Sequence, residues 1–240
     1  MNRQAQAVVL VLFGGAILKA SLTDVYLRYV KEGLQPFLIA AGVLLLAAAV
    51  MTLVHDLRGT AGGQDHGHGH GHGHHEPRVG WLLILPAAGL LLIAPPALGS
   101  YAAGQSGSVL ASTQIESEFS PLPPGDPVPL SLMDYASRAV FDAGKSLEGR
   151  TVRLTGFVTP GPDGRPMLAR MVLACCAADG RPIKVGLTGG ANVDAPVDTW
   201  VQVVGTYSSR MDKDPVNGAE VPYLEVKTWE KTTAPRRPYE

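Results

Sequence analysis

The chain has 240 residues, 46% of them hydrophobic and only 17% charged, and its 20 basic and 21 acidic residues nearly cancel. A balance this close to neutral argues against a nucleic-acid-binding protein, which normally carries a basic stripe. The two cysteines are adjacent and cannot build a disulfide framework, so cysteine usage does not indicate the redox compartment.

Residues 1–99 are interpreted as a transmembrane region with three apolar segments. The second, residues 37–54, contains no charged residue, and the third, residues 81–98, opens with Trp81, which suits a membrane interface. Both approach the length of about 20 residues that a helix needs to cross the hydrocarbon core. The sequence therefore predicts a multi-pass protein of the cell membrane with three transmembrane helices.

The first of the three segments begins at Gln6, and its apolar run meets Lys19 before it reaches spanning length. It crosses the bilayer if the helix continues toward Tyr29. A cleaved signal peptide is the alternative, because Arg3 precedes a short apolar run. We favour the helix, since Lys19 and Asp24 suit a contact between packed helices at least as well as a cleavage region.

Between the second and third segments, residues 64–76 form a histidine loop in which histidine and glycine alternate. Alternating glycine prevents a stable helix or packed strand, so we expect a mobile loop. Neutral imidazole is a good ligand for zinc, nickel or copper, and flexible spacing lets several rings reach one ion. The alternative is a solvated linker without a role. On the metal hypothesis the ligands are His66, His68, His70, His72, His74 and His75.

The distribution of positive charge predicts the orientation of the chain. No lysine or arginine lies between Arg78 and Arg138. Because positively charged flanks are retained in the cytoplasm, this stretch favours an extracytoplasmic C-terminal domain and a cytoplasmic histidine loop.

Two further segments follow the membrane region. Residues 100–130 are rich in Gly, Ser, Ala and Pro and are interpreted as a tether that its prolines stiffen toward the end. Residues 131–240 form the predicted soluble domain. It begins with a short amphipathic helix that Ser131 caps, with apolar residues three and four positions apart and Gly144 near its end.

From Arg150 onward the apolar residues alternate with polar ones, which is typical of strands. Clusters of Gly, Pro and Asp separate five such stretches. Five short strands in about 80 residues favour an all-β domain, an OB-like five-stranded barrel, with a small sandwich as the alternative. In this interpretation Cys175 and Cys176 end a strand and lie on opposite faces of it.

Three interpretations of the cysteine pair stay open. Both residues can be small buried hydrophobic side chains. They can bind zinc or another transition metal with Asp179, and three side chains plus water, or a site shared with a partner, fit better than a four-ligand site because the soluble part has no histidine. They can also form a vicinal disulfide, which opposite strand faces disfavour. If one sulfur is functional, Cys176 with Asp179 is the better candidate.

The soluble part does not suggest an enzyme. It contains no combination of serine, histidine and an acidic residue of the kind that forms a catalytic triad, and no glycine-rich phosphate-binding loop. Asp212 and Asp214 form a pair of carboxylates that we interpret as solvated turn residues. Trp200 and Trp229 mark a contact surface if both are exposed, and otherwise they pack.

Four stretches, GRTVRLTGFVT, LARMVLACCAADGRPIKVGL, DTWVQVVGTY and VPYLEV, together with LIAPPALGS, carry a resemblance to a known family. They resemble the YcgQ-like family of uncharacterised bacterial membrane proteins. Gly180 departs from the family's run Cys-Cys-x-Ala-Asp-Ala, in which an alanine is expected. The resemblance implies one subunit of a two-component permease, with an accessory role beside a larger multi-spanning permease, and it supplies no catalytic mechanism.

These features together predict a non-catalytic accessory subunit of a membrane permease, related to metal ions, whose soluble β domain contacts a partner or a metal. Its expected partners are a multi-spanning permease and the lipid bilayer, without nucleic acid. The alternative is an extracytoplasmic thiol, redox or metal-binding envelope protein that acts through Cys175 and Cys176.

Overall fold

The computed structural model describes residues 3–60, 89, 96–112 and 119–240. The chain divides into two compact units. The N-terminal unit comprises Met1–Tyr26 and Lys31–Pro96, and the C-terminal unit comprises Leu27–Val30 and Ala97–Glu240.

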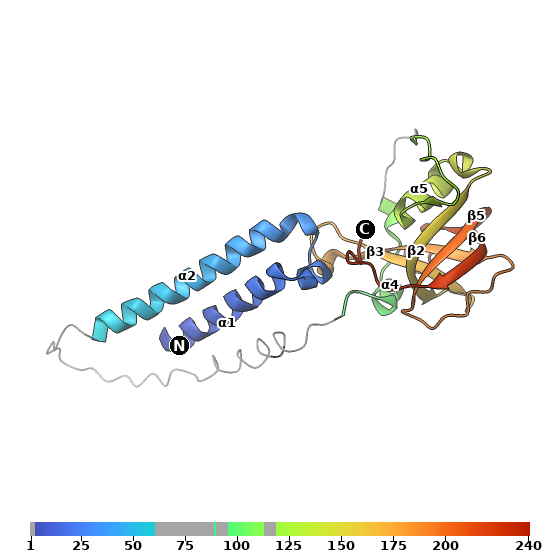
Figure 1. Cartoon of the computed structure of the whole chain (residues 1–240). Helices are drawn as coiled ribbons and strands as arrows, with labels where there is room; N and C mark the ends of the chain where they lie inside the picture. The colour runs from blue at the N-terminus through green and yellow to red at the C-terminus, as the bar shows by residue number, and fades with distance from the viewer. Residues whose placement is uncertain (1–2, 61–88, 90–95, 113–118) are drawn as a thin grey trace. The chain divides into compact units, whose positions relative to one another are not determined.

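Two helices, α1 (Arg3–Leu22) and α2 (Gln35–Thr60), pack against each other in the N-terminal unit (Figure 1). The short 3-10 turn η2 (Glu32–Leu34) leads directly into α2. A Cβ atom on Gly14 would lie 3.1 Å from the carbonyl oxygen of Gly42, and one on Gly42 would lie 2.7 Å from Cγ of Leu18. Because neither glycine carries a side chain, the two helix backbones can approach closely.

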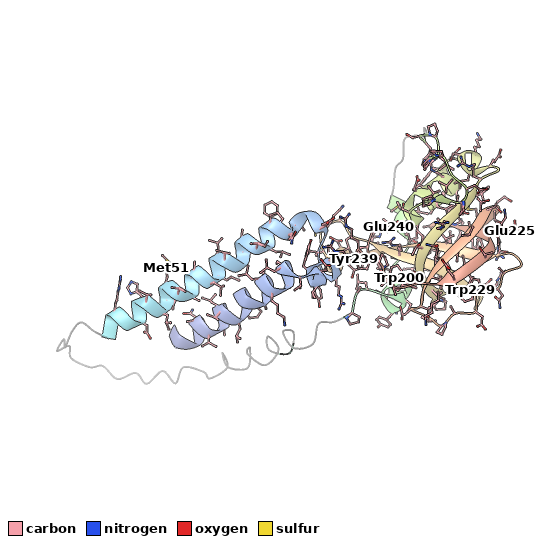
Figure 2. All side chains as sticks on the ribbon, in the orientation of Figure 1. Met51, Trp200, Glu225, Trp229, Tyr239 and Glu240 are labelled. Carbon is pink, nitrogen blue, oxygen red and sulfur yellow. The ribbon has the colours of Figure 1, made fainter. Side chains whose placement is uncertain are left out.

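The expectation of three transmembrane helices is wrong for the part of the chain that the structure describes. One helical stretch there, Glu32–Asp56, is long and apolar enough to cross a membrane, and only 11% of its apolar window is buried. Met51, which projects from α2 in Figure 2, is 74% exposed. The apolar part of α1, Gln6–Leu22, falls short.

The physical reason lies at the end of α1. The helix stops at Leu22, and the chain turns into the 3-10 turn η1 (Asp24–Arg28) instead of continuing toward Tyr29. The hydroxyl of Thr23 donates to the carbonyl of Lys19 over the last turn of α1. The third predicted segment, residues 81–98, lies outside the described residues except for residue 89 and residues 96–98.

The C-terminal unit is built on a closed β-barrel (Figure 1). The strand order is β1-β2-β3-β4-β6-β5, and an additional β2–β5 pairing closes five of these strands into a barrel. β4 and β6 pair in parallel, and the other four pairings around the barrel are antiparallel. The expected five-stranded barrel is confirmed, and the sandwich is excluded. The strands are β1 (Val128–Pro129), β2 (Thr151–Pro160), β3 (Pro166–Val172), β4 (Arg181–Thr188), β5 (Trp200–Lys213) and β6 (Glu220–Lys231).

Alternation along the strands fills the barrel. In β2, Val152 and Leu154 are fully buried, and in β5 the same holds for Val201 and Val203. The residues between them are half-buried, as expected for strands with one face on the core. Gly156 lets β2 and β3 approach, since a Cβ there would lie 2.7 Å from the carbonyl oxygen of Ala169.

Helix α5 (Leu132–Phe141) packs its apolar face on the barrel core, against β2, β4 and β6. Ser131 caps it as expected, because its hydroxyl accepts a hydrogen bond from the N–H of Asp134. The phenol of Tyr135 is fully buried and donates to the carbonyl of Tyr223 at 2.7 Å. The 3-10 turn η5 (Lys145–Leu147) then connects α5 to β2.

Three short elements lie among the described residues of the segment that composition assigns to a tether: helix α4 (Ser100–Gln105), the 3-10 turn η4 (Val109–Ser112) and strand β1. All three belong to the C-terminal unit. Ala103 of α4 packs with Phe157 and Met171 on the outer face of β2 and β3. Asp198 fixes the start of α4 by accepting hydrogen bonds from the backbone N–H and the hydroxyl of Ser100, both at 2.7 Å.

Trp200 and Trp229, both labelled in Figure 2, pack against neighbouring residues rather than form an exposed pair. Trp200 meets Phe157 edge to face at 5.7 Å, and the guanidinium of Arg170 lies over its ring. Trp229 packs against the barrel core and donates from Nε1 to the carbonyl of Asn192 at 3.0 Å.

Candidate metal centre

The cysteine pair lies in the connection between β3 and β4. Strand β3 ends at Val172, and the chain bends at Ala174 and Cys175 before the 3-10 turn η6 (Ala177–Asp179). The expectation that the two cysteines continue the strand on opposite faces is therefore wrong. Because the backbone bends, strand alternation no longer separates the two sulfurs.

The bend brings three metal-ligand side chains together. The two sulfurs of Cys175 and Cys176 and a carboxylate oxygen of Asp179 all lie within 4.8 Å of one another. Cys175 is exposed, whereas Cys176 and Asp179 are half-buried. This is the group of residues that spacing alone singled out, and the geometry shows that it could hold a metal ion.

Asp179 organises the bend through its carboxylate. Oδ1 accepts the N–H of Ala174 at 2.9 Å, and Oδ2 accepts the N–H groups of Cys175 at 2.8 Å and of Cys176 at 3.1 Å. In return, the backbone N–H of Asp179 donates to the sulfur of Cys176, which completes a capping box at the start of η6. These hydrogen bonds show that Asp179 holds the backbone of the bend in place.

The segment Leu27–Val30 of the same unit also contacts this connection. The N–H of Ala177 donates to the carbonyl of Tyr29 at 2.7 Å, and Val30 forms an antiparallel bridge with Cys176. Tyr239 donates from its hydroxyl to the carbonyl of Arg28 at 2.8 Å. These bonds fix the backbone beside Cys176 and leave Cys175 on the outside.

Hydrogen bonding shifts the protonation of the cluster in opposite directions. The Cys175 thiol and the surrounding backbone N–H groups stabilise the charged carboxylate, which lowers the pKa of Asp179 to about 2. The same contact with Asp179, together with one from Cys176, raises the pKa of the Cys175 thiol to about 11. At neutral pH the exposed sulfur therefore carries a proton that it shares with the carboxylate.

The donor set fits a soft or borderline metal ion with an incomplete coordination sphere. Two sulfurs select zinc, copper(I) or a similar ion over magnesium or calcium. Both acceptor sites of Oδ2 serve backbone N–H groups, so Oδ1 is the carboxylate atom with room for an ion. A bound ion would replace the thiol proton, because a thiolate is the form that ligates metals.

The six predicted histidine ligands, His66 to His75, lie outside the described residues. Among the described residues, Cys175, Cys176 and Asp179 form the one group of three potential ligands that lies close enough to hold an ion. The histidine loop therefore remains a prediction from composition.

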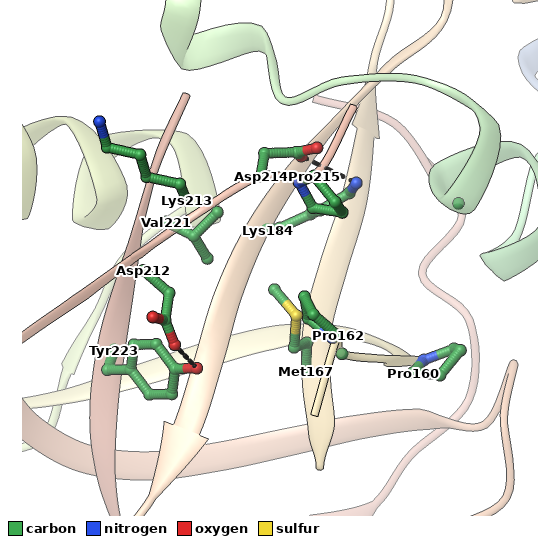
Figure 3. Close-up of a pocket in the computed structure, with 12 residues that line it drawn as sticks. Pro160, Pro162, Met167, Lys184, Asp212, Lys213, Asp214, Pro215, Val221 and Tyr223 are labelled. Atoms are coloured by element: carbon green, nitrogen blue, oxygen red, sulfur yellow. Dashed lines mark hydrogen bonds and ion pairs between the residues drawn. The ribbon is translucent and has the colours of Figure 1, made fainter. Parts of the chain in front are cut away.

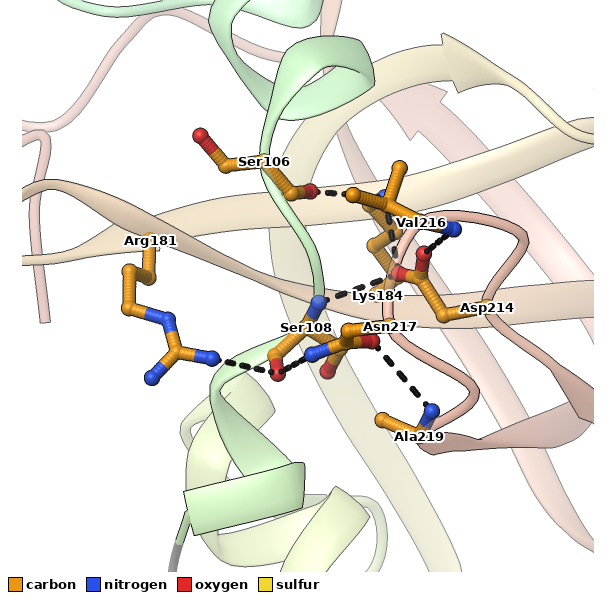
Figure 4. Close-up of polar contacts among 8 residues, drawn as sticks. All are labelled: Ser106, Ser108, Arg181, Lys184, Asp214, Val216, Asn217 and Ala219. Atoms are coloured by element: carbon orange, nitrogen blue, oxygen red, sulfur yellow. Dashed lines mark hydrogen bonds and ion pairs between the residues drawn. The ribbon is translucent and has the colours of Figure 1, made fainter.

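One buried polar cluster was not expected from the sequence. Asp214, interpreted there as a solvated turn residue, is 2% exposed and accepts a hydrogen bond from buried Lys184 at 2.9 Å. It also accepts the N–H groups of Ser108 and Val216 (Figure 4). Arg181 and Asn217 donate to the carbonyl of Ser108, so the segment between α4 and η4 is fixed on the barrel. Strand alternation offered no signal for this burial, because it places Lys184 on the face opposite Ile183 and Val185.

Comparison with known families covers both units. The DUF1980 N-terminal domain matches residues 5–108, and the DUF1980 C-terminal domain matches residues 136–240. No curated protein and no solved structure matches the chain. Because the two matches together include α1, α2, the barrel and the cysteine pair, the chain belongs to the DUF1980 family.

Proposed function

We propose that this chain is a non-catalytic, membrane-attached accessory subunit of a permease, and that it presents a transition-metal ion, zinc foremost, on Cys175, Cys176 and Asp179. The observation that carries the proposal is the convergence of two sulfurs and one carboxylate within 4.8 Å at an exposed bend. The YcgQ-like resemblance of the sequence supplies the link to a two-component permease and its multi-spanning partner.

An incomplete coordination sphere suits transfer better than storage. Structural zinc sites are closed by four protein ligands, whereas sites that exchange a ligand keep a position open. Three side chains leave such a position, and exposed Cys175 lies where a donor from another protein can reach the ion. The site would then pass the ion to its partner by ligand exchange.

Membrane attachment through α2 supports this role. The helix is apolar over a spanning length, and its side chains are mostly exposed in the N-terminal unit, as lipid-facing residues would be. We infer from the positive-inside distribution that the barrel lies outside the cytoplasm. There it would meet metal ions that enter or leave through the permease.

Spectroscopy with Co²⁺ in place of zinc tests the site on the full chain in detergent. The six histidines of residues 64–76 are first replaced by asparagine, since the loop would otherwise bind the probe. We expect a thiolate-to-cobalt charge-transfer band that zinc abolishes by competition. Replacing Cys175 or Cys176 by serine should remove the band and weaken zinc binding at least about 100-fold, because a direct ligand contributes more than the groups that orient ligands, whose loss costs about 10–100-fold.

Two variants that each remove one carboxylate charge test whether zinc binding depends on Asp179 itself or only on the net charge. Asp179→Asn should weaken zinc binding, whereas Asp163→Asn, an exposed change in another loop, should not. Absence of the charge-transfer band in the chain that retains both cysteines would refute the metal site. Equal zinc affinity in the Asp179 and Asp163 variants would remove Asp179 from the ligand set.

Purification under mild detergent tests the accessory role independently. A tagged full chain should carry a multi-spanning membrane protein with it at a fixed ratio. If no such protein accompanies the chain under several mild detergents, the assignment as a subunit fails, even where the metal site holds.

A redox role is the second candidate, favoured by the bent backbone that removes the strand-face objection. Here the two thiols would lose two protons and two electrons to a disulfide-bearing partner protein and form an S–S bond. Mass spectrometry after exposure to oxidised glutathione separates the candidates. A mass loss of two hydrogens shows that the vicinal disulfide forms. If bound zinc prevents this loss, the cysteines can both bind zinc and form the disulfide, whereas an unchanged mass without zinc excludes the vicinal disulfide.

A further inference from the structure

A pocket of about 190 Å³ opens in the C-terminal unit, and residues 174–179, the bend with the cysteine pair, do not line it. It lies between the turn that joins β2 to β3, the turn that joins β5 to β6, and helix α4 (Figure 3). Most of its lining is apolar, with side chains of Pro160, Pro162, Met167 and Val221 in its walls. A volume of this size suits a ligand on the order of ten non-hydrogen atoms.

Two polar groups face each other across this apolar lining (Figure 3). On one wall the ammonium of Lys184 donates to Asp214 at 2.9 Å and to the carbonyl of Ser106 at 3.2 Å. An ammonium has three N–H donors, so one donor of Lys184 remains for a ligand. On the other wall the phenol of Tyr223 donates to Asp212 at 2.7 Å.

The charges of the pocket are already matched within the protein. Lys184 pairs with Asp214, and Asp212 pairs with Arg210 at 3.0 Å. The ammonium of Lys213 points away from the other lining residues (Figure 3). A charged ligand would therefore bury an uncompensated charge, which disfavours both cations and anions.

We propose that this pocket binds a small neutral molecule with an apolar ring or branched chain and a carbonyl oxygen that accepts a hydrogen bond from Lys184. Pro162, Met167 and Val221 provide the apolar contact, and the Asp212 carboxylate on the opposite wall can accept an N–H from the ligand. The proposal does not depend on the metal site, because none of its residues belongs to the bend at Cys175.

Fluorine NMR on the full chain in lipid nanodiscs tests it, with para-fluorobenzamide as the neutral probe and para-fluorobenzoate as its charged counterpart. Empty nanodiscs correct for partition into lipid. We expect the amide to bind with a dissociation constant on the order of 1 mM, the range open to so small a ligand. The benzoate should bind at least about tenfold more weakly, since its charge finds no free partner.

A pocket-filling variant and a matched control locate the binding. A Cβ atom at Gly104 in α4 meets no atom within 4 Å, so Gly104→Phe adds a ring at the pocket without a backbone clash. Gly190→Phe adds the same ring in the β4–β5 connection, where a Cβ also meets nothing within 4 Å. The first variant should weaken amide binding at least about tenfold by occupying the volume, and the second should leave it unchanged.

Three results would overturn the proposal: no amide binding beyond empty nanodiscs, equal binding by both glycine variants, or benzoate binding as tight as that of the amide. If Gly104→Phe does not fold, the comparison of amide and benzoate on the unaltered chain still decides the question.

Discussion

At the scale of single residues, the buried pair of Lys184 and Asp214 is the most consequential contact in the C-terminal unit. Their side chains are 9% and 0% exposed. A charge buried this deeply is tolerated because it is paired and hydrogen-bonded. Asp214 meets both conditions, since it accepts Lys184 and two backbone N–H groups, and it links the β5–β6 turn to the segment after α4.

Replacing Lys184 should destabilise the protein, because it leaves the Asp214 carboxylate buried without its ion-pair partner. Lys184→Met is expected to lower the free energy of unfolding by about 3 kcal/mol, the range found when one member of a buried pair is deleted. Lys213→Met, an exposed neighbour on β5, should change it by less than about 0.5 kcal/mol. Urea denaturation of both variants measures the difference, and similar midpoints would show that the pair contributes little.

The same carboxylate should make stability depend on acid pH. Burial alone would raise the pKa of Asp214, but hydrogen bonds from Lys184 and from the N–H of Val216 outweigh it and lower the pKa below its ordinary 3.8. A lowered folded-state pKa stabilises the protein above the unfolded value, and that stabilisation is lost as pH falls through the folded value. As pH falls below about 4, the unaltered chain should therefore lose stability more steeply than Asp214→Asn. Parallel slopes for the two proteins would contradict this role.

At the scale of elements, helix α5 is fixed at both ends. Glu240 accepts the N–H groups of Leu132 and Met133 at 2.9 Å each, which satisfies donors at the start of the helix beside the Ser131 cap. At the other end, Gly144 has φ 74° and lies directly against the ring of Tyr207. The turn into β2 thus needs glycine both for its conformation and for its lack of a side chain.

Two alanine substitutions in this turn separate conformation from packing. Gly149 also has a positive φ of 67°, but a Cβ there meets nothing within 4 Å. Gly149→Ala should cost about 1 kcal/mol of stability for the left-handed conformation alone. Gly144→Ala should cost about 3 kcal/mol, because displacement of Tyr207 adds to the same strain. Thermal unfolding followed by near-UV circular dichroism, which reports tyrosine packing, tests this; equal costs would mean that Tyr207 moves freely.

At the scale of the whole molecule, an apolar helical unit and a polar barrel unit are joined in one chain. The N-terminal unit exposes large hydrophobic residues on α2, among them Phe37, Leu44 and Met51, each at least 69% exposed. Such a face suits contact with lipid, which the proposed membrane attachment requires. The barrel unit instead buries most of its hydrophobic residues in one core with α5, and a smaller cluster packs between α4 and the outer face of β2 and β3.

Membrane insertion of α2 should respond to a charge at its centre. Leu44→Arg is expected to disfavour insertion by about 3 kcal/mol, the insertion cost of arginine at mid-membrane. The carbonate-resistant membrane fraction of the expressed chain should therefore fall. Leu22→Arg, at the end of α1 and similarly exposed, should have little effect because a terminal arginine can reach the interface. An unchanged fraction for Leu44→Arg would argue against insertion of α2.

The sequence by itself determined the local elements of this protein. Alternation around Val152 and Val201 identified strands, three-and-four spacing after Ser131 identified α5, and the uncharged run at residues 37–54 identified the core of α2. These features depend on the periodicity of neighbouring residues and on single helix-capping residues, both of which are properties of short stretches of the chain.

Only the tertiary structure decided which of these elements meet. The β2–β5 pairing that closes the barrel, the burial of Asp214 against Lys184, and the bend that joins Cys175, Cys176 and Asp179 all depend on contacts between distant segments or on a single break in strand geometry. The continuation of α1 beyond Leu22 was predicted wrongly for the same reason. Local pattern specifies which face of an element is apolar, but the partner of that face is chosen by packing and burial across the whole chain.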